Sequence, residues 1–312
     1  RTPARRRDKA MARRRKNYFH YVDQDSLSRI SGEPLLTPFP MEGSVSGHHR
    51  SPHKGSSVEF AEYREYTPGE DPKRMDWRVF ARSDRYYLKE FEAETNLRSH
   101  FALDCSGSMG FGDPKSKLEF GKSLVSTLSY LYVGQGDAVG LHTLRRRKPQ
   151  VLPAKRNPSQ IQEFLEVLGP VKPKGDTFLA PALHEIAETV RMRAMIFVVS
   201  DMLDEPSEIL DAVLHLRDRK HEVVLFHLFD RQELEFDFDR PTRFVDLEGG
   251  GSLITEPTVI REEYLARLDE HVQELRKGCL ESQARYHVVR TDKPLVDAID
   301  QFSAGRIGGK AA

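Results

Sequence analysis

Cysteine and long apolar runs are both scarce in this chain, and each scarcity excludes a class of protein. Only two cysteines occur among 312 residues, Cys105 and Cys279, which are too few for the disulfide framework of a small secreted domain. No window approaches the roughly 18 uncharged apolar residues of a membrane-spanning helix, and the basic first residues lack the apolar centre of a signal peptide. The sequence therefore predicts a cytoplasmic globular protein with free thiols and no transmembrane segment.

Several catalytic signatures are also missing. The chain contains no G-x-x-x-x-G-K-[S/T] phosphate-binding loop, no H-E-x-x-H zinc motif and no Cys-x-x-Cys pair. His48, His49 and His53 lie close together, but their spacing does not fix the geometry of a transition-metal site, and we interpret them as polar loop residues. These absences disfavour nucleotide hydrolysis and zinc catalysis.

Positive charge is concentrated at one end of the chain. Residues 1–16 contain nine Lys or Arg and a single acid, Asp8, and because the whole chain has 48 residues of each sign, the rest carries an excess of eight acids. A basic arm can contact nucleic acid or anionic lipid. We interpret it instead as a disordered arm, or as sequence upstream of a start at Met11, and the acidic body argues against a dedicated nucleic-acid-binding protein.

Strand-like and helix-like segments alternate from residue 95 to residue 305, which indicates an α/β domain with a mostly parallel sheet flanked by helices. Asp113-Pro114 reads as the start of the first helix, and Ser159-x-x-Gln162 as a capping box. We also expect a helix over residues 264–277 with one apolar face. The remaining expected elements are strands at 97–104, 138–144, 195–200, 223–229 and 286–289, and helices beginning at Leu179, Ser207, Glu262 and Leu295.

The most informative stretch is FALDCSGSM, in which an apolar run ends in Asp104 and is followed by Ser106 and Ser108. A strand would deliver Asp104 to the edge of the sheet, and a tight turn at Gly107 would bring both hydroxyls to the same point. Carboxylate and hydroxyl oxygens suit a hard cation such as Mg²⁺, with Mn²⁺ and Ca²⁺ as alternatives. This D-x-S-x-S motif therefore predicts part of a metal site.

Two further oxygen donors follow later strands or loops. Thr177 stands at the expected start of a helix, and Asp201 closes AMIFVVSD, the most apolar strand-like run of the chain. In an open parallel sheet the loops at the carboxyl ends of the strands meet in one crevice, so residues about a hundred positions apart can converge there. Both are therefore candidate ligands of the same cation.

The set Asp104, Ser106, Ser108, Thr177 and Asp201 resembles the metal-ion-dependent adhesion site of von Willebrand factor A-type domains. The segment from His48 to Glu94 resembles the region before such a domain in the bacterial "domain of unknown function 58" family. The matching positions are Glu59, Arg64, Tyr66, Gly69, Asp71, Arg74, Asp76, Trp77, Ala81 and Arg82. Their chemistry indicates a salt-bridge network held by aromatic packing, and a partner-binding surface is the alternative.

The resemblance implies a von Willebrand factor A-like, Rossmann-like domain over residues 95–305. We expect it to be preceded by a family-specific region at 17–94, partly extended and β-rich from about residue 58, and followed by a short tail at 306–312. A short helix at 24–30 and a strand at 85–91 are expected in that region.

The resemblance also implies a function: a Mg²⁺-dependent protein-binding module whose metal accepts an acidic side chain from a partner. The partner that it implies is an ATPase of the MoxR class of AAA proteins, in a chaperone-like or assembly role. A metal-dependent hydrolase or phosphotransferase using Asp104 is the alternative, although the second acid that a haloacid dehalogenase would have two positions later is here Ser106. A nucleic-acid-associated factor using the basic arm is a third, weaker hypothesis.

Overall fold

A six-stranded sheet lies at the centre of the computed structural model, which describes residues 18–30, 54–55, 59–65, 79–80, 82, 86–92, 98–146, 148–176 and 178–307. The strand order is β11-β8-β7-β4-β5-β6, and every neighbouring pair is parallel except β5 with β6. The strands are β4 (Arg98–Asp104), β5 (Ala138–Leu144), β6 (Val151–Lys155), β7 (Met195–Ser200), β8 (Glu222–Phe229) and β11 (Arg285–Arg290).

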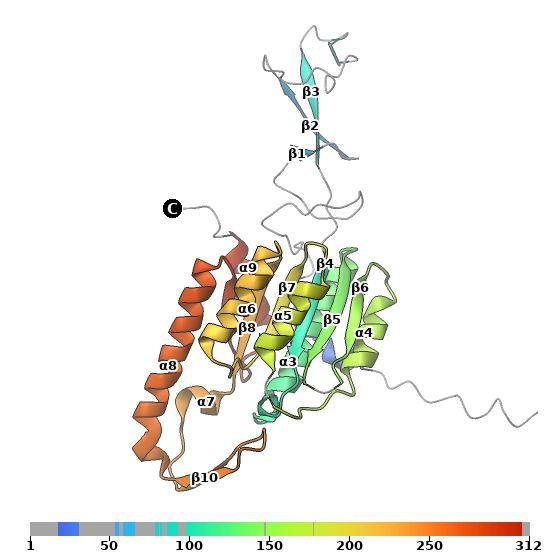
Figure 1. The fold of residues 1–312 in the computed structure, drawn as a ribbon. Coiled ribbons are helices and arrows are strands. Elements are labelled where there is room, and N and C mark those ends of the chain that lie inside the picture. Colours follow the sequence, from blue (N-terminus) through green and yellow to red (C-terminus); the bar gives the residue numbers. More distant parts are fainter. Residues whose placement is uncertain are drawn as a thin grey trace, which may run out of the picture.

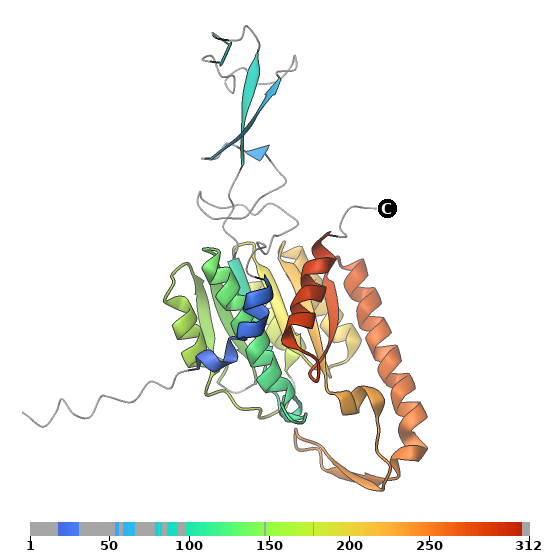
Figure 2. The same ribbon diagram turned by 180° about the vertical axis from the view of Figure 1, so that it is seen from behind.

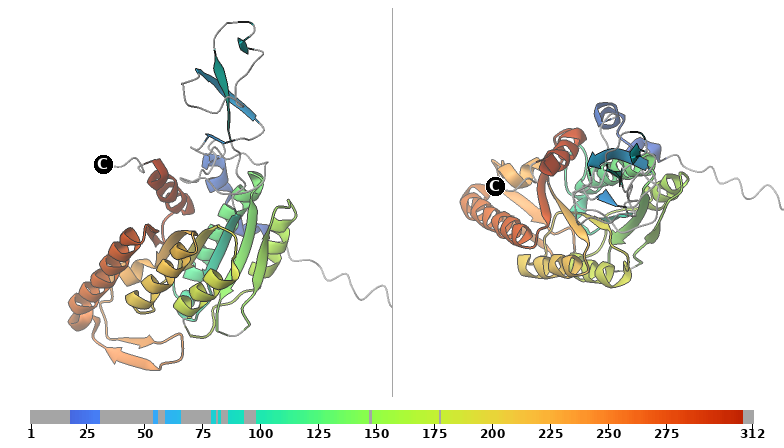
Figure 3. Two further views of the ribbon diagram at one scale, coloured as in Figure 1. Left: turned by 45° about the horizontal axis from the view of Figure 1, so that its top comes forward. Right: turned by 90° about the horizontal axis from the view of Figure 1, so that it is seen from above.

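Helices cover both faces of this sheet (Figures 1 and 3). One face packs against α3 (Lys117–Gly134), α4 (Gln160–Leu168) and α9 (Leu295–Ile307), and the other against α5 (Leu179–Thr189), α6 (Pro206–Asp218) and α8 (Pro257–Glu281). Because both faces are covered, every residue of β5, β7 and β8 is buried, which explains their nearly continuous apolar sequences. The predicted α/β class is confirmed. No helix in the described ranges combines the length and the apolar character needed to cross a membrane.

Aromatic side chains fill the core on the α3 side of the sheet. Phe101 of β4 stacks on Phe197 of β7 with ring centroids 4.9 Å apart, and Phe164 of α4 meets Phe101 edge-on at 5.8 Å. All three rings are fully buried. Their packing fixes β4 against β7, and two predicted metal ligands stand at the ends of these strands: Asp104 is the last residue of β4, and Asp201 directly follows β7.

Residues 18–30 pack against the helices on this same face (Figure 2). They form a 3₁₀ turn, η1 (Phe19–Tyr21), and a short helix, α1 (Gln24–Ile30), whose bounds match the helix expected from the sequence. The backbone N–H of Asp23 donates to the Thr127 hydroxyl at 3.0 Å, and the Lys122 ammonium donates to the Tyr21 hydroxyl at 3.2 Å. Both bonds tie the segment to α3.

Two small antiparallel sheets complete the described elements. The first contains β1 (Lys54–Gly55), β2 (Glu59–Glu65) and β3 (Tyr87–Glu92) in the order β1-β3-β2, and β3 corresponds to the strand expected near residues 85–91. The second is the hairpin of β9 (Thr242–Val245) and β10 (Ser252–Thr255), which the sequence pattern did not predict. The edge strand β6 was also missed. The short helix α7 (Arg231–Glu235) and the 3₁₀ turn η3 (Ser108–Gly110) lie in the loops after β8 and β4.

Two helix starts differ from the sequence prediction. Helix α3 begins at Lys117 rather than at Asp113-Pro114, because the Ser116 hydroxyl accepts the backbone N–H of Glu119 at 3.2 Å and acts as the N-cap. At α4, Ser159 makes no side-chain cap bond because its backbone is already helical, with φ −72° and ψ −11°. The predicted capping box is therefore wrong, and the Asn157 side chain instead accepts the Ser159 N–H at 3.0 Å.

Candidate functional site

The candidate metal site lies where the chain changes direction across the sheet. After β4 the chain builds β5 and β6 on one side, and it then returns to place β7 on the other side of β4. Asp104 is the last residue of β4 and Asp201 directly follows β7, so the two carboxylates meet at this switch point. In open α/β sheets such crevices are the usual place for ligands.

Both carboxyl oxygens of Asp104 accept a hydrogen bond, and these bonds fix its side chain. Its Oδ1 accepts the backbone N–H of Ser106 at 2.9 Å, and its Oδ2 accepts the hydroxyl of Ser200 at 2.6 Å. The side chain is 1% exposed, and burial together with the charge of nearby Asp201 raises its pKa to about 7. A nearby cation would favour the ionised form of this carboxyl.

The two serines of the motif face each other in the loop that follows Asp104. The Ser106 and Ser108 hydroxyl oxygens are 2.9 Å apart, and both residues are buried. The loop is fixed to a distant segment, because the Gly107 N–H donates to the Gly175 carbonyl at 2.8 Å and the Lys174 N–H donates to the Cys105 carbonyl at 3.0 Å. The structure therefore brings the segment just before Thr177 to this loop, while Thr177 itself lies outside the described residues.

Asp201 is as buried as Asp104 but has fewer partners. Its Oδ2 lies 2.7 Å from the Lys117 ammonium, whereas its Oδ1 has no hydrogen-bond partner in the described part of the chain. An unpartnered carboxylate oxygen that is shielded from water is costly. This oxygen is therefore well placed to coordinate a metal ion.

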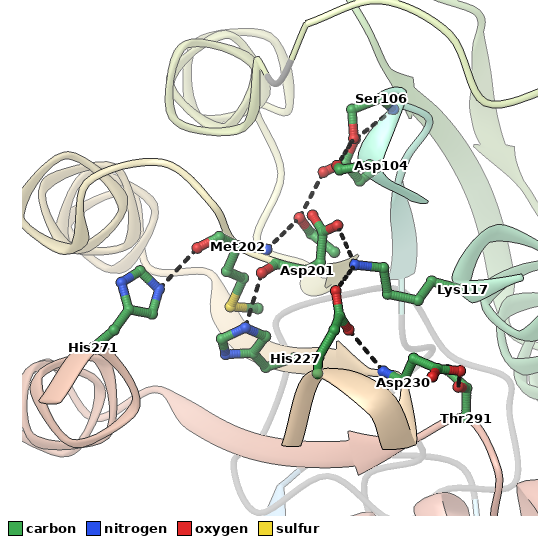
Figure 4. A network of polar contacts seen from close by, with 12 residues as sticks. Asp104, Ser106, Lys117, Asp201, Met202, His227, Asp230, His271 and Thr291 are labelled. Atoms are coloured by element: carbon green, nitrogen blue, oxygen red, sulfur yellow. Dashed lines mark hydrogen bonds and ion pairs between the residues drawn. The ribbon is translucent and has the colours of Figure 1, made fainter. Parts of the chain in front are cut away.

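Lys117 is buried and forms ion pairs with Asp201, as Figure 4 shows, and with the partly buried Glu233, contacts that the sequence analysis did not anticipate. The Lys117 ammonium is 2.6 Å from Glu233 Oε1, and the Lys117 side chain is 1% exposed. Burial alone would lower the pKa of this lysine, but the charges of Asp201 and Glu233 raise it, so it remains an ammonium. Two N-cap patterns in the sequence could have drawn attention to these positions, Ser116-x-x-Glu119 before α3 and Asp230-x-x-Glu233 before α7.

Two histidines hold the loop after β7 by hydrogen bonds to its backbone carbonyls. Burial lowers the pKa of His227 to about 3, so the ring is neutral. Its Nε2 lies 2.9 Å from the Asp201 carbonyl, which can only accept, so Nε2 carries the proton and Nδ1 accepts from the Tyr286 hydroxyl at 2.6 Å. His271 Nε2 likewise lies 2.9 Å from the Met202 carbonyl. These contacts fix the backbone of the residue that carries the unpartnered carboxylate.

The donor set fits a hard divalent cation. The Lys117 ammonium contacts the carboxyl groups of Asp201 and Glu233, and the Asp104 carboxyl lies near that of Asp201, so three carboxyl groups gather around one ammonium. In the described residues no group of three or more His, Cys, Asp or Glu side chains is arranged to hold a metal ion, so a cation at this site would also need the serine hydroxyl oxygens. Carboxylate and hydroxyl oxygens are the ligands that Mg²⁺ prefers.

The hairpin of β9 and β10 contacts the loop of residues 105–108, which carries two of the predicted ligands and is called the metal loop below. The carbonyl oxygen of Leu247, in the β9–β10 turn, lies so close to Gly107 that an added Cβ there would be 2.2 Å from it. Between the hairpin and α7 lies a groove of about 420 Å³, whose aromatic lining includes Phe111, Phe236 and Tyr264. Glycine at position 107 is therefore required by close approach of the hairpin.

Cys105, between the two predicted ligands, is not a nucleophile in this structure. Its thiol is fully buried in the core and donates to the Leu103 carbonyl at 3.3 Å. Burial raises its pKa to about 12, which keeps it protonated. Cys279 is also a buried free thiol, as expected.

The family-specific segment is described only in part. Glu59 and Arg64 lie in β2, and Arg82 is exposed. The other predicted positions lie outside the described residues: Tyr66, Gly69, Asp71, Arg74, Asp76, Trp77 and Ala81. The basic arm at 1–16 and the histidines at 48, 49 and 53 also lie outside, so the predictions about them stay predictions.

Comparisons with known proteins agree with the predicted family. A family model described as "Protein of unknown function DUF58" matches residues 62–274, which is more than half of the chain. The uncharacterized protein Rv1480 of Mycobacterium tuberculosis is 24% identical over 281 residues, covering 87% of each chain. The uncharacterized protein Mb1516 of Mycobacterium bovis is similar to the same extent.

Solved structures also match the domain. The conserved hypothetical protein BatB of Bacteroides thetaiotaomicron aligns with a TM-score of 0.45 and 18% identity, covering 68% of this chain and 99% of that one. The VWA domain of SpRpn10 aligns with a TM-score of 0.41 and 14% identity, covering 66% and 95%.

Proposed function

The chain belongs to the DUF58 family, and from this premise and the geometry of the site we propose that its von Willebrand factor A-like domain is a Mg²⁺-dependent protein-binding module. Asp104, Ser106, Ser108, Thr177 and Asp201 would hold the cation. The observation that carries the proposal is the buried Asp201 Oδ1, which has no hydrogen-bond partner among the described residues, inside a cluster of three carboxyl groups and one ammonium. When bound, the cation would supply a positive point that accepts one further anionic ligand.

The arrangement supports docking rather than turnover. Asp104 is fixed by hydrogen bonds to both oxygens, and Cys105 is a buried thiol. Only two of the five proposed ligands are charged, so the cation keeps affinity for a carboxylate presented by another protein. We propose a MoxR-type AAA ATPase as that partner.

Metal binding is tested first, by thermal and chemical unfolding with and without Mg²⁺. At about one hundred times its dissociation constant, Mg²⁺ should stabilise the wild-type protein by about 2.7 kcal/mol. Asp201→Asn should abolish this stabilisation, whereas Asp211→Asn, at an exposed position on α6, should retain it. Equal stabilisation of all three proteins would refute the metal site.

Partner binding is tested second, with a purified MoxR-type ATPase from the same organism in an interferometry assay. Binding in Mg²⁺ that is lost in chelator and in Asp104→Ala supports docking through the metal. Binding that is indifferent to both changes would contradict it. Hydrolysis of a generic phosphoester that requires Mg²⁺ and Asp104 would favour the hydrolase hypothesis instead.

A further inference from the structure

A strongly basic cavity opens directly beside the candidate metal loop. Its volume is about 620 Å³, and the described residues that line it are Arg145, Arg146, Lys148, Lys174, Gly175 and Asp176. Four cationic side chains thus surround a cavity that contains a single carboxylate. In a protein whose body carries an excess of acidic residues, such a concentration of positive charge requires an explanation.

The cavity and the metal loop belong to the same edge of the sheet. Arg145 directly follows β5, whose last residue, Leu144, is the strand partner of Asp104. On the other side, Lys174 donates its backbone N–H to the Cys105 carbonyl at 3.0 Å. Lys174, on one side of the cavity, is therefore hydrogen-bonded to Cys105, the residue after Asp104. Arg145, on the other side, is the residue after Leu144, which pairs with Asp104 in the sheet.

The two arginines of the cavity, Arg145 and Arg146, have only weak partners among the described residues. The Nε and Nη2 atoms of Arg145 are buried and have no hydrogen-bond partner in the described ranges. The guanidinium lies near the Cys105 thiol, which is a weak acceptor. Arg146 and Asp176 are 3.9 Å apart with side chains 70% and 63% exposed, so this pair is loose and readily exchanged.

We propose that the cavity binds a second acidic side chain of the partner segment whose first acidic side chain reaches the metal. This inference rests on the proposed function and specifies the partner: a peptide segment with at least two closely spaced Asp or Glu residues. The Nε and Nη2 edge of the Arg145 guanidinium matches a carboxylate, which accepts bidentate bonds, once the side chain turns from the Cys105 thiol toward the cavity. The cationic side chains of the cavity add long-range attraction that favours clustered acids over a single one.

The test uses two fluorescein-labelled nonapeptides in Mg²⁺, one with four Glu residues alternating with Gly and Ser, and one with a single central Glu. Fluorescence anisotropy should show that the four-Glu peptide binds at least about tenfold more tightly, and that Arg145→Gln with Lys174→Gln removes this advantage. Lys155→Gln is the matched control, because Lys155 pairs with Val139 at the opposite end of β5 and is 58% exposed. Arg145→Lys keeps the positive charge but loses the paired donors of the guanidinium, and it should bind the four-Glu peptide with intermediate affinity.

The outcomes separate this inference from the proposed function. If both peptides bind only with Mg²⁺ but with equal affinity, and the cavity variants change nothing, the metal site stands and the acidic-segment inference is overturned. If neither peptide responds to Mg²⁺ or to Asp201→Asn, the proposed function fails. If single-stranded DNA or inorganic phosphate displaces the four-Glu peptide at lower concentration than unlabelled peptide does, the cavity is a phosphate site and the inference is wrong. Unchanged Mg²⁺-dependent unfolding of the cavity variants shows that they are folded.

Discussion

Two polar clusters are buried in the same sheet, and they differ in charge. In the first, His100 Nδ1 lies 3.0 Å from His142 Nε2, and burial lowers the pKa of these histidines to about 3 and about 4, so both are neutral. In the second, at the carboxyl ends of β4 and β7, the Asp104 and Asp201 carboxyl groups lie close together, and the Lys117 ammonium contacts Asp201. The two neutral histidines satisfy each other by a hydrogen bond, whereas a cluster with more carboxyl groups than ammonium groups can be stabilised by a cation. This difference is the reason to place ligand binding at the second cluster.

We expect the largest effect on stability from removing the Lys117 ammonium, which contacts both Asp201 and Glu233. Lys117→Met leaves the buried Asp201 and the partly buried Glu233 without a counter-charge, and we expect it to lower the free energy of unfolding by about 3 kcal/mol in chelator. Urea denaturation measures the change, and Lys155→Met, at an exposed position, is the control. A loss below about 1 kcal/mol would mean that the carboxyl groups are protonated or hydrated in the folded protein, so that the second cluster carries no more charge than the histidine pair.

The neutral cluster should respond to pH instead. His100 and His142 have folded pKa values below the unfolded value of about 6.5, so between these values the unfolded chain binds more protons and stability falls as the pH falls. Each histidine should contribute a loss of roughly 2 kcal/mol between pH 6.5 and 4.5. The double variant His100→Leu with His142→Leu should therefore lose less stability over this window than the wild type, by urea denaturation at each pH. Parallel pH profiles would show that the histidines are solvated.

These two clusters were not equally visible in the sequence. Asp104 and Asp201 could be predicted because each ends an apolar run, and parallel strands bring their carboxyl ends together. Lys117 could not, because a lysine in the first turn of a helix normally points to solvent, and its acidic partners come from positions 201 and 233. Its burial is a consequence of tertiary packing at the switch point.

Tertiary packing also explains why the sequence pattern did not predict three of the strands. The strands β6, β9 and β10 are four or five residues long and partly exposed, so they lack the continuous apolar runs that identified β5, β7 and β8. Their positions are set by neighbours: β6 pairs at the sheet edge with β5, and the β9–β10 turn lies on Gly107. The polar stretch from Arg145 to Lys155 was therefore interpreted only as a basic connection, although its first residue lines the cavity beside the metal loop.

The contact between the hairpin and the metal loop can be tested by adding one methyl group. Gly107→Ala would place a Cβ 2.2 Å from the Leu247 carbonyl, so either the hairpin or the loop must move, at a cost of about 1–3 kcal/mol. Hydrogen exchange should show faster exchange in β9 and β10, and Mg²⁺ affinity should fall because Ser106 and Ser108 flank the altered residue. Gly134→Ala, with open space around its Cβ position at the end of α3, is the matched control. Unaltered exchange in the hairpin would show that it does not rest on the metal loop.

The smallest expected effect concerns the start of α3, which positions Lys117. Ser116→Ala removes the hydroxyl that accepts the Glu119 N–H, and we expect a loss of about 1 kcal/mol. Asp113→Ala, at the position that the sequence pattern favoured as the cap, should change stability by less than about 0.5 kcal/mol because its side chain is exposed and lies three residues before the cap. Since Lys117 is the first residue of this helix, fraying at Ser116 should also loosen the ammonium from Asp201. A double variant with Lys117→Met should then lose less than the sum of the two single losses, whereas full additivity would show that the cap and the charged cluster act independently.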